Sequence, residues 1–393
     1  SVFLKINIKI MNVKTIGISI ISISFIVLFF NCSKDVKTQK SEVVKVVEDL
    51  KIIGYVAGYE DFDPALVDVK KLTHINYAFA NIDDGKPKFE LDTDSIKISK
   101  VMALKKTNPN LKVLYSIGGW VWSNKFTHAA AYPEAREQFA ISSVQLMKKH
   151  GFDGVDLDWE YPGQRGEDND FRPSDKENFT LLMAEIRKHL EKAGTIDNTH
   201  YLLTIATGAD QAYADNTNLG KAHEYLDFIN VMCYDYYHGW HYQTGHHANL
   251  YPSEKEKFTG NSGQEAIDSF MKIGVPANKL VMGIPFYGRQ WGKVSLSNDG
   301  LYQNAMSPGI IVPYWDIVEK IKSGNYKKGY DDSAKASYLW SATDSIFISW
   351  ETPKDVELKV EYVKQNGLGG AMFWEYSLDK DQELLNTLFK SIK

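Results

Sequence analysis

The sequence predicts an α/β fold, a (β/α)8 TIM barrel with a small α+β insertion between the seventh strand and its helix. Apolar β runs alternate with amphipathic helical patterns along most of the chain. Helical patterns lie between several of the runs, at Tyr132–His150, Lys176–Ala193 and Ser262–Ile273. The eight β runs are Lys51–Tyr59, His74–Asn81, Lys112–Trp120, Gly154–Tyr161, Tyr201–Thr207, Phe228–Tyr234, Leu280–Tyr287 and Gly369–Tyr376.

The seventh crossover is too long for a simple loop. Between Gly288 and Ile348 only Trp315–Ser323 has a helical pattern, and the expected helix comes late, at Pro353–Gln365. The segment is rich in Trp and Tyr, which a mobile surface loop would not require. We therefore predict an inserted α+β unit at 290–348 that forms one wall of a groove.

Composition limits the classes of partner. The 393 residues suffice for one large domain with an insertion, and 44% hydrophobic content is ordinary for a globular protein. The 9 Trp, 22 Tyr and 19 Phe offer flat apolar faces that suit sugar rings. Cys32 and Cys233 are the only cysteines, so we expect no disulfide framework and no cysteine-based metal site.

The N-terminal segment has the pattern of an export signal. Lysines precede an uncharged apolar run, Ile16–Phe30, which ends at Asn31-Cys32 and resembles a bacterial lipoprotein signal. Asn31 stands where such signals usually carry a small residue, so an uncleaved anchor and ordinary secretory cleavage remain alternatives. We expect a signal at 1–32, a tether at 33–50 and an exported protein, either a cell-surface or outer-membrane lipoprotein or a secreted one.

Without residues 1–31, which contain three Lys and no acid, the net charge changes from −5 to −8. A body this acidic disfavours nucleic acid and suits a neutral substrate. We therefore expect no nucleic-acid partner, a monomer, and membrane contact only through a lipid on Cys32.

A cluster of acidic residues marks the fourth β run. Apolar and acidic residues alternate from Val155 to Tyr161, so Asp156, Asp158 and Glu160 share one strand face at about 6.6 Å per step. Like charges this close cannot all stay ionised, so at least one pKa must rise.

Three interpretations compete for this strand. A solvated acidic face conflicts with the bulky opposite face, and a calcium loop would need a Gly after the third carboxylate. The third is a catalytic cluster at the C-terminal end of a barrel strand, where the loops of barrel active sites begin. Pro162 and Gly163 place Glu160 at that rim. We favour the catalytic cluster.

The sequence also resembles glycoside hydrolase family 18, the chitinases, over about 51–390. Asp153-Gly-Val-Asp156-Leu-Asp158-Trp-Glu160 matches the family's Asp-x-x-Asp-x-Asp-x-Glu signature. Further matching blocks are Ser116-Ile-Gly-Gly119-Trp120, Met232-Cys-Tyr234-Asp235, Trp240 to Leu250, Asp175 to Leu182, Gly283 to Arg289 and Gly367 to Trp374. The resemblance implies a catalytic barrel at 51–393, with 290–348 as the chitinase insertion domain.

The resemblance implies a substrate-assisted, retaining mechanism without a cofactor or metal. Glu160 is then the general acid and base, and the substrate's N-acetyl oxygen attacks C1 to give an oxazolinium ion. Asp158 accepts the acetamido N–H, Asp156 shares a proton with Asp158, and Tyr234 aligns the acetamido oxygen.

The remaining candidates are substrate contacts. Trp374 is the expected floor of the −1 site, and Asp235 and Arg289 hold polar groups of the sugar. The other candidates are Trp120, Trp240, Gly119, Tyr161, Tyr55, Phe79 and Met232, with packing the commoner role for Met232. Trp120 and Trp240 are favoured for the groove because they begin loops.

Several neighbouring residues have plainer explanations. Ser116 either donates a hydrogen bond into the cluster or is an ordinary polar residue of the barrel layer. Asp153 faces away from the cluster and supports the loop. His246 and His247 lack a third ligand at metal spacing, so a structural role outweighs a zinc site.

Three functions remain in competition. The first is a chitinase that cleaves β-1,4-linked N-acetylglucosamine. The second is an inactive chitin-binding lectin, against which the presence of Glu160 argues. The third is an endo-β-N-acetylglucosaminidase acting on glycoproteins, against which the Trp240–Leu250 segment and the insertion argue.

Overall fold

The computed structural model describes residues 50–256 and 260–393. The predicted signal at 1–32, Cys32 and almost all of the tether at 33–50 lie outside the described residues. Within the described part, no helix combines the length and the apolar character needed to cross a membrane.

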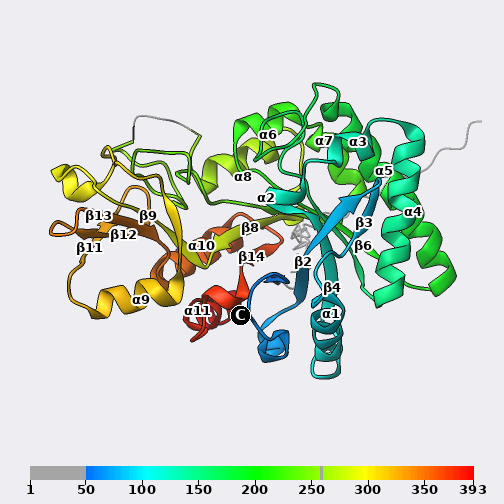
Figure 1. Cartoon of the computed structure of the whole chain (residues 1–393), viewed down its shortest axis with the longest axis horizontal. Helices are drawn as coiled ribbons and strands as arrows, with labels where there is room; N and C mark the ends of the chain where they lie inside the picture. Colours follow the sequence, from blue (N-terminus) through cyan, green and yellow to red (C-terminus); the bar gives the residue numbers. More distant parts are fainter. Residues whose placement is uncertain (1–49, 257–259) are drawn as a thin grey trace, which may run out of the picture. The chain divides into compact units, whose positions relative to one another are not determined.

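Eight parallel strands close into a barrel (Figure 1). They are β1 (Lys51–Ala57), β2 (His74–Asp83), β4 (Lys112–Gly118), β5 (Gly154–Asp158), β6 (Leu202–Thr207), β7 (Phe228–Val231), β8 (Leu280–Pro285) and β14 (Gly370–Trp374). The hydrogen-bonded order is β1-β14-β8-β7-β6-β5-β4-β2, and pairing of β1 with β2 completes the circle. The predicted barrel is confirmed, and each strand overlaps the β run predicted for it.

Helices connect the strands, and the long ones match the predicted patterns. Their bounds are α1 (Asp94–Ala103), α2 (Gly119–Trp122), α3 (Phe126–Ala130), α4 (Pro133–His150), α5 (Asp175–Asp197), α6 (Gln211–Asn216), α7 (Leu219–Ala222), α8 (Gly263–Lys272), α10 (Pro353–Gln365) and α11 (Glu383–Ile392). The start of α10 is fixed by a capping box, in which the side chains of Thr352 and Asp355 each accept the other's backbone N–H.

The insertion is a five-stranded antiparallel sheet with one helix, seen to one side of the barrel in Figure 1. Its strands, in sheet order, are β10 (Ile310–Pro313), β9 (Tyr287–Trp291), β13 (Ile346–Trp350), β12 (Ala336–Ser341) and β11 (Lys327–Asp331), and its helix is α9 (Tyr314–Lys322). The sheet extends a few residues beyond both ends of the predicted 290–348. Trp291, Trp340 and Phe347 are buried in its own small core, which accounts for part of the segment's aromatic content.

A short hairpin was not predicted. Strand β3 (Lys86–Lys88) pairs antiparallel with the end of β2. Asp84 and Gly85 at its turn both have positive φ, which is the geometry of the tight hairpin turns that Asp-Gly favours. The Asp-Gly pair in the sequence was therefore a usable signal.

Strand β5 is shorter than predicted, because it ends at Asp158 and not at Tyr161. Its neighbours pair with it only that far, through Gly118 on β4 and Ala206 on β6. A Cβ on Gly118 would lie 2.3 Å from the carbonyl oxygen of Asp158, so only glycine allows this close approach. Glu160 therefore lies beyond the strand.

A buried ion pair ties the insertion to the barrel loops. Lys359 on α10 is 1% exposed, and its Nζ donates to Glu351 Oε1 and to the carbonyl oxygen of Ala248, each at 2.6 Å. Glu351 follows β13, and Ala248 lies in the loop after β7. One ammonium group thus joins three segments around the site.

Lys359→Met should destabilise the protein by about 3–5 kcal/mol, because it leaves the Glu351 carboxylate buried without its partner. Urea unfolding measures this change. Lys322→Met is the matched control, since Lys322 and Glu319 form an exposed pair, and it should leave the unfolding free energy nearly unchanged. Equal effects of the two substitutions would contradict the role given to Lys359.

Candidate active site

Asp156 is at the centre of a buried hydrogen-bond network inside the barrel. Its carboxylate is fully buried, and hydroxyl groups from three other strands donate to it. They are Tyr55 at 2.8 Å, Ser116 at 2.6 Å and Thr204 at 2.5 Å. Burial raises the pKa of Asp156, and these donors oppose the rise. Of the two roles considered for Ser116, the structure has the hydrogen bond.

Asp158 has fewer partners. Its Oδ1 is buried without a hydrogen-bond partner among the described residues. Burial, followed by the charges of Glu160 and Asp156, raises its pKa well above the usual value. The charge of Asp156 acts on Asp158, and proton sharing between the two stays a prediction.

Glu160 lies at the bottom of the cleft with 8% of its surface exposed. Burial raises the pKa of its carboxyl to about 8; Tyr161 partly offsets the rise and the charge of Asp235 adds to it. A carboxyl group with such a pKa remains protonated at neutral pH and can donate a proton.

The cleft above these residues has a volume of about 1190 Å³. It brings together most of the predicted site residues: Asp158, Glu160, Tyr161, Phe79, Trp120, Trp240, Met232, Tyr234, Asp235, Arg289 and Trp374. Three others do not line it. Asp156 and Tyr55 are buried in the barrel interior. Gly119 lies against Phe79, and a Cβ added to Gly119 would be 2.6 Å from the Phe79 ring.

Aromatic rings form the floor of the cleft. Trp374, at the end of β14, stacks on Phe79 with 5.5 Å between ring centroids and 18° between planes. Tyr55 supports the same indole from within the barrel at 5.5 Å. An indole fixed in this way offers a flat apolar surface to a ring that enters the cleft.

One wall is joined to the insertion by an ion pair. Arg289 on β9 donates from Nε and Nη2 to the two carboxylate oxygens of Asp235, both at 2.7 Å. Burial alone would raise the pKa of Asp235, but the charge and hydrogen bonds of Arg289, with His247 3.6 Å away, lower it below its usual range. The insertion thus supplies a positive charge to the cleft, fixed by a bidentate contact.

Loops after three strands meet at the mouth of the cleft. Trp120 and Trp240 lie 5.3 Å apart, and the Arg165 guanidinium lies 5.1 Å from the Trp240 ring. Trp240 is 49% exposed, whereas Trp291 is fully buried in the insertion core. Trp120 and Trp240, the two tryptophans favoured for the groove, both line it, as does Trp122.

Several lining residues were not predicted. They include Tyr59, Gln164, Arg165, Asp210, Tyr236, Tyr237, His238, His241 and Ile311. The run Tyr236-Tyr-His238 directly follows Asp235 after β7, so its polar aromatic composition was a usable signal. Ile311 on β10 had none, because only the fold of the insertion brings that strand to the cleft.

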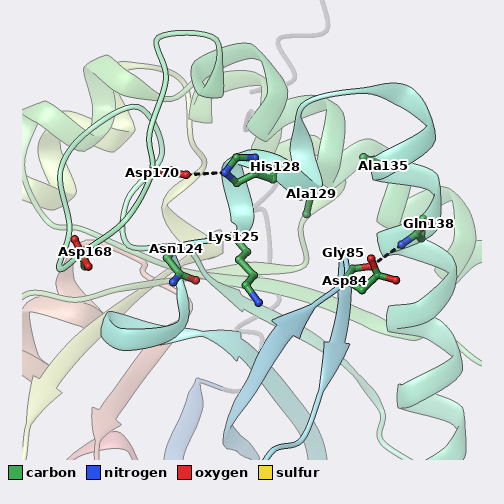
Figure 2. A pocket seen from close by; sticks show the side chains of 10 residues that line it. All are labelled: Asp84, Gly85, Asn124, Lys125, His128, Ala129, Ala135, Gln138, Asp168 and Asp170. Atoms are coloured by element: carbon green, nitrogen blue, oxygen red, sulfur yellow. Dashed lines mark hydrogen bonds and ion pairs between the residues drawn. The ribbon is translucent and has the colours of Figure 1, made fainter.

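A second cavity, of about 680 Å³, lies beside α3 and α4 (Figure 2). No Trp, Tyr or Phe is among the described residues that line it. Some of its polar side chains already have partners: His128 Nε2 lies 2.7 Å from Asp170, and Gln138 donates to the carbonyl oxygen of Asp84. It therefore offers no surface comparable to the cleft.

Of the residues given plainer roles, Asp153 and His246 lie away from the cleft, whereas His247 lies next to a cleft residue. Asp153 binds Lys105 and accepts the backbone N–H of Val113 at the opposite end of β5. His246 is buried, and its Nε2 lies 3.3 Å from Oδ2 of Asp331, a residue of the insertion. His247 Nδ1 lies 3.6 Å from Asp235 Oδ1.

Among the described residues, one group has metal-ligand spacing, with ligand atoms within 4.8 Å: Glu137, Glu185 and His189. None of the three lines the cleft. Lys188 and His189 already pair with Glu185, so we assign this group no function.

The barrel, the buried acid beyond β5 and the aromatic floor define a barrel enzyme of the glycoside-hydrolase class. Residues 51–379 match the family described as Glycosyl hydrolases family 18. The chain belongs to this family.

Similar proteins include Chitinase A1 of Niallia circulans, 36% identical over 88% of this chain and 58% of the relative. Chitinase B of Serratia marcescens is 32% identical over 81% of this chain and 76% of its own length. A family 18 N-acetylglucosaminidase structure from Paenibacillus barengoltzii superposes with a TM-score of 0.82 and 36% identity, covering 87% of this chain and 99% of that one. The chain thus spans little more than half of Chitinase A1.

The raised pKa of Glu160 predicts a cost in stability. Between the unfolded value near 4.5 and the folded value of about 8, the unfolded chain loses this proton first, so the contribution of Glu160 to stability declines as pH rises. Glu160→Gln keeps a neutral side chain at every pH. It should be more stable than the wild type by a few kcal/mol near pH 8 and nearly equal to it near pH 5.

Urea unfolding at both pH values measures the difference. Glu167→Gln changes an exposed side chain on the same loop and should have an equally small effect at both. A Glu160→Gln advantage that did not grow with pH would contradict a protonated, buried Glu160.

Proposed function

We propose that the protein is a chitinase, which hydrolyses β-1,4-linked N-acetylglucosamine polymers or oligomers with retention of configuration. The observation that carries the proposal is the buried Glu160 carboxyl in the cleft, with a pKa of about 8, next to the unpaired Oδ1 of Asp158. An acid beside an unused acceptor suits a substrate with both a glycosidic oxygen and an amide N–H. Family membership supports the same conclusion.

In the proposed first step, Glu160 transfers its proton to the glycosidic oxygen as the bond from C1 to that oxygen breaks. The acetamido oxygen of the same sugar bonds to C1, so the leaving group is replaced from the opposite face and an oxazolinium ion forms. In the second step a water molecule attacks C1 and gives a proton to the Glu160 carboxylate, while the bond from C1 to the acetamido oxygen breaks and the neutral acetamido group is restored. Two inversions at C1 give net retention.

Two residues near Glu160 orient the acetamido group for attack on C1 in this proposal. Asp158 Oδ1 accepts the acetamido N–H, which orients the group and offsets the positive charge that develops on it. Tyr234, which lines the cleft, donates to the acetamido oxygen. Asp156, held by its hydroxyl donors, fixes the strand beneath them and adds negative potential.

The cleft walls suit a neutral, ring-shaped substrate. The Trp374 indole stacks under the apolar face of the sugar in the −1 site, while the Asp235–Arg289 pair binds polar groups beside it. Trp120 and Trp240 offer further stacking at the mouth. The lectin alternative is disfavoured because the acid and its surroundings are intact.

The proposal predicts hydrolysis of chitin oligomers but not of cello-oligosaccharides, which lack the acetamido nucleophile. Glu160→Gln should reduce kcat by roughly a hundredfold to ten-thousandfold, whereas Glu167→Gln should not change it. The kcat/KM of the wild type should fall as pH rises through about 8, because the acid loses its proton. Chromatography of the products gives rates and product sizes.

Other results of this hydrolysis experiment would support other functions. A wild type that binds chitin oligomers without cleaving them would support a lectin. Cleavage of an N-glycan core but not of chitin would support a glycoprotein-directed enzyme. Equal cleavage of cello-oligosaccharides would contradict substrate assistance.

We also propose, from the N-terminal sequence, that the protein is exported and carries a lipid on Cys32. The apolar run Ile16–Phe30 directly before Asn31-Cys32 supports this. Cells fed a labelled fatty acid should label the wild type and not Cys32→Ala. Equal label on both, or none on the wild type, would contradict lipidation.

A further inference from the structure

The segment that carries Glu160 has left the barrel sheet. Both neighbouring strands stop pairing with β5 at Asp158, so the backbone of Glu160 has no strand partner. The residue is nevertheless buried, and a buried backbone N–H requires an acceptor. Something outside the sheet must therefore fix the position of the acid.

Ser123 is the acceptor. Its Oγ lies 2.9 Å from the backbone nitrogen of Glu160, and the side chain is fully buried. The same oxygen lies 2.8 Å from the carbonyl oxygen of Gly119 and 2.9 Å from that of Asp158. The hydroxyl has one proton, which it donates to one of these carbonyls. Ser123 thus contacts the backbone of Asp158 and of Glu160, on both sides of Trp159, and the backbone at the start of α2.

We propose that Ser123 is a positioning residue for the general acid, which holds the Glu160 backbone so that its carboxyl points into the cleft. The inference rests on the proposed role of Glu160. Ser123 does not line the cleft, so it acts through the backbone that it holds and not by touching the substrate. It ends α2, the helix that carries Trp120, and so joins a substrate-facing loop to the acid.

Removal of the hydroxyl has a predictable consequence. The Glu160 N–H is left without its partner, and the segment beyond β5 is free to shift or to admit water. A displacement of about 1 Å in a catalytic group is enough to reduce the rate by roughly a hundredfold. Because burial is the main cause of the raised pKa of Glu160, added water should lower that pKa.

The experiment compares three variants on a chitin oligomer. Ser123→Ala should reduce kcat by roughly ten- to a hundredfold, leave KM within about threefold, and move the alkaline limb of kcat/KM to lower pH. Ser123→Thr keeps the hydroxyl and should recover most of kcat. The matched control is Ser143→Ala on α4, since Ser143 is equally buried and its Oγ donates to the carbonyl oxygen of Phe139 at 2.7 Å. It should keep the wild-type kcat and pH profile.

A Ser123→Ala enzyme with wild-type kcat and an unmoved alkaline limb would overturn the proposal, whatever its stability. If this variant does not fold, Ser123→Cys replaces it, because a thiol fills the site of the hydroxyl but is a weak hydrogen-bonding group. The decrease in kcat and the shift of the alkaline limb should then be smaller than in Ser123→Ala. A failure of the proposed function is distinct, since the wild type would then be inactive. In that case, infrared titration of the Glu160 carboxyl in Ser123→Ala still tests the positioning role, with an unmoved midpoint counting against it.

Discussion

The cost of burying charge governs this site. Asp156, Asp158, Glu160 and Asp235 all lie in or under one cleft, where an unpaired charge is strongly disfavoured. For three of these four groups, the chain meets this cost in a different way. Hydroxyl donors from three strands surround Asp156, Arg289 neutralises Asp235, and Glu160 keeps its proton. Only the last of these leaves a proton available at neutral pH, which is what the proposed chemistry uses.

The barrel and the insertion each supply part of the surroundings of these carboxyl groups. The closed sheet places Asp156 where Tyr55, Ser116 and Thr204 converge, so its position is fixed by the register of the strands. The insertion sheet supplies Arg289 and with it the pairing of Asp235. Glu160 belongs to neither sheet. Its freedom from the strand ladder allows the carboxyl to face the cleft. Its position then depends on the hydrogen bond that its backbone N–H donates to Ser123, in the loop after β4.

Local pattern was enough for the fold and for the acidic cluster. Strict alternation predicted a strand that carries Asp156 and Asp158, with Glu160 just beyond its end, and the delayed helix Pro353–Gln365 located the insertion. Pattern could not show where β5 stops, because that depends on how far its neighbours pair with it. Nor could it show Ile311 in the cleft or Tyr55 and Gly119 beneath it, since these positions follow from tertiary packing. The Asp84-Gly85 pair is a sequence signal for the β2–β3 hairpin, which was not predicted.

The central claim is that burial keeps Glu160 protonated in the free protein. Infrared titration of the wild type, with Glu160→Gln subtracted, measures this group directly through its protonated carbonyl band. The account predicts that the band persists at neutral pH and disappears with a midpoint near pH 8. A midpoint near the ordinary glutamate value of 4.5 would show that the acid is ionised at neutral pH, and would contradict the account.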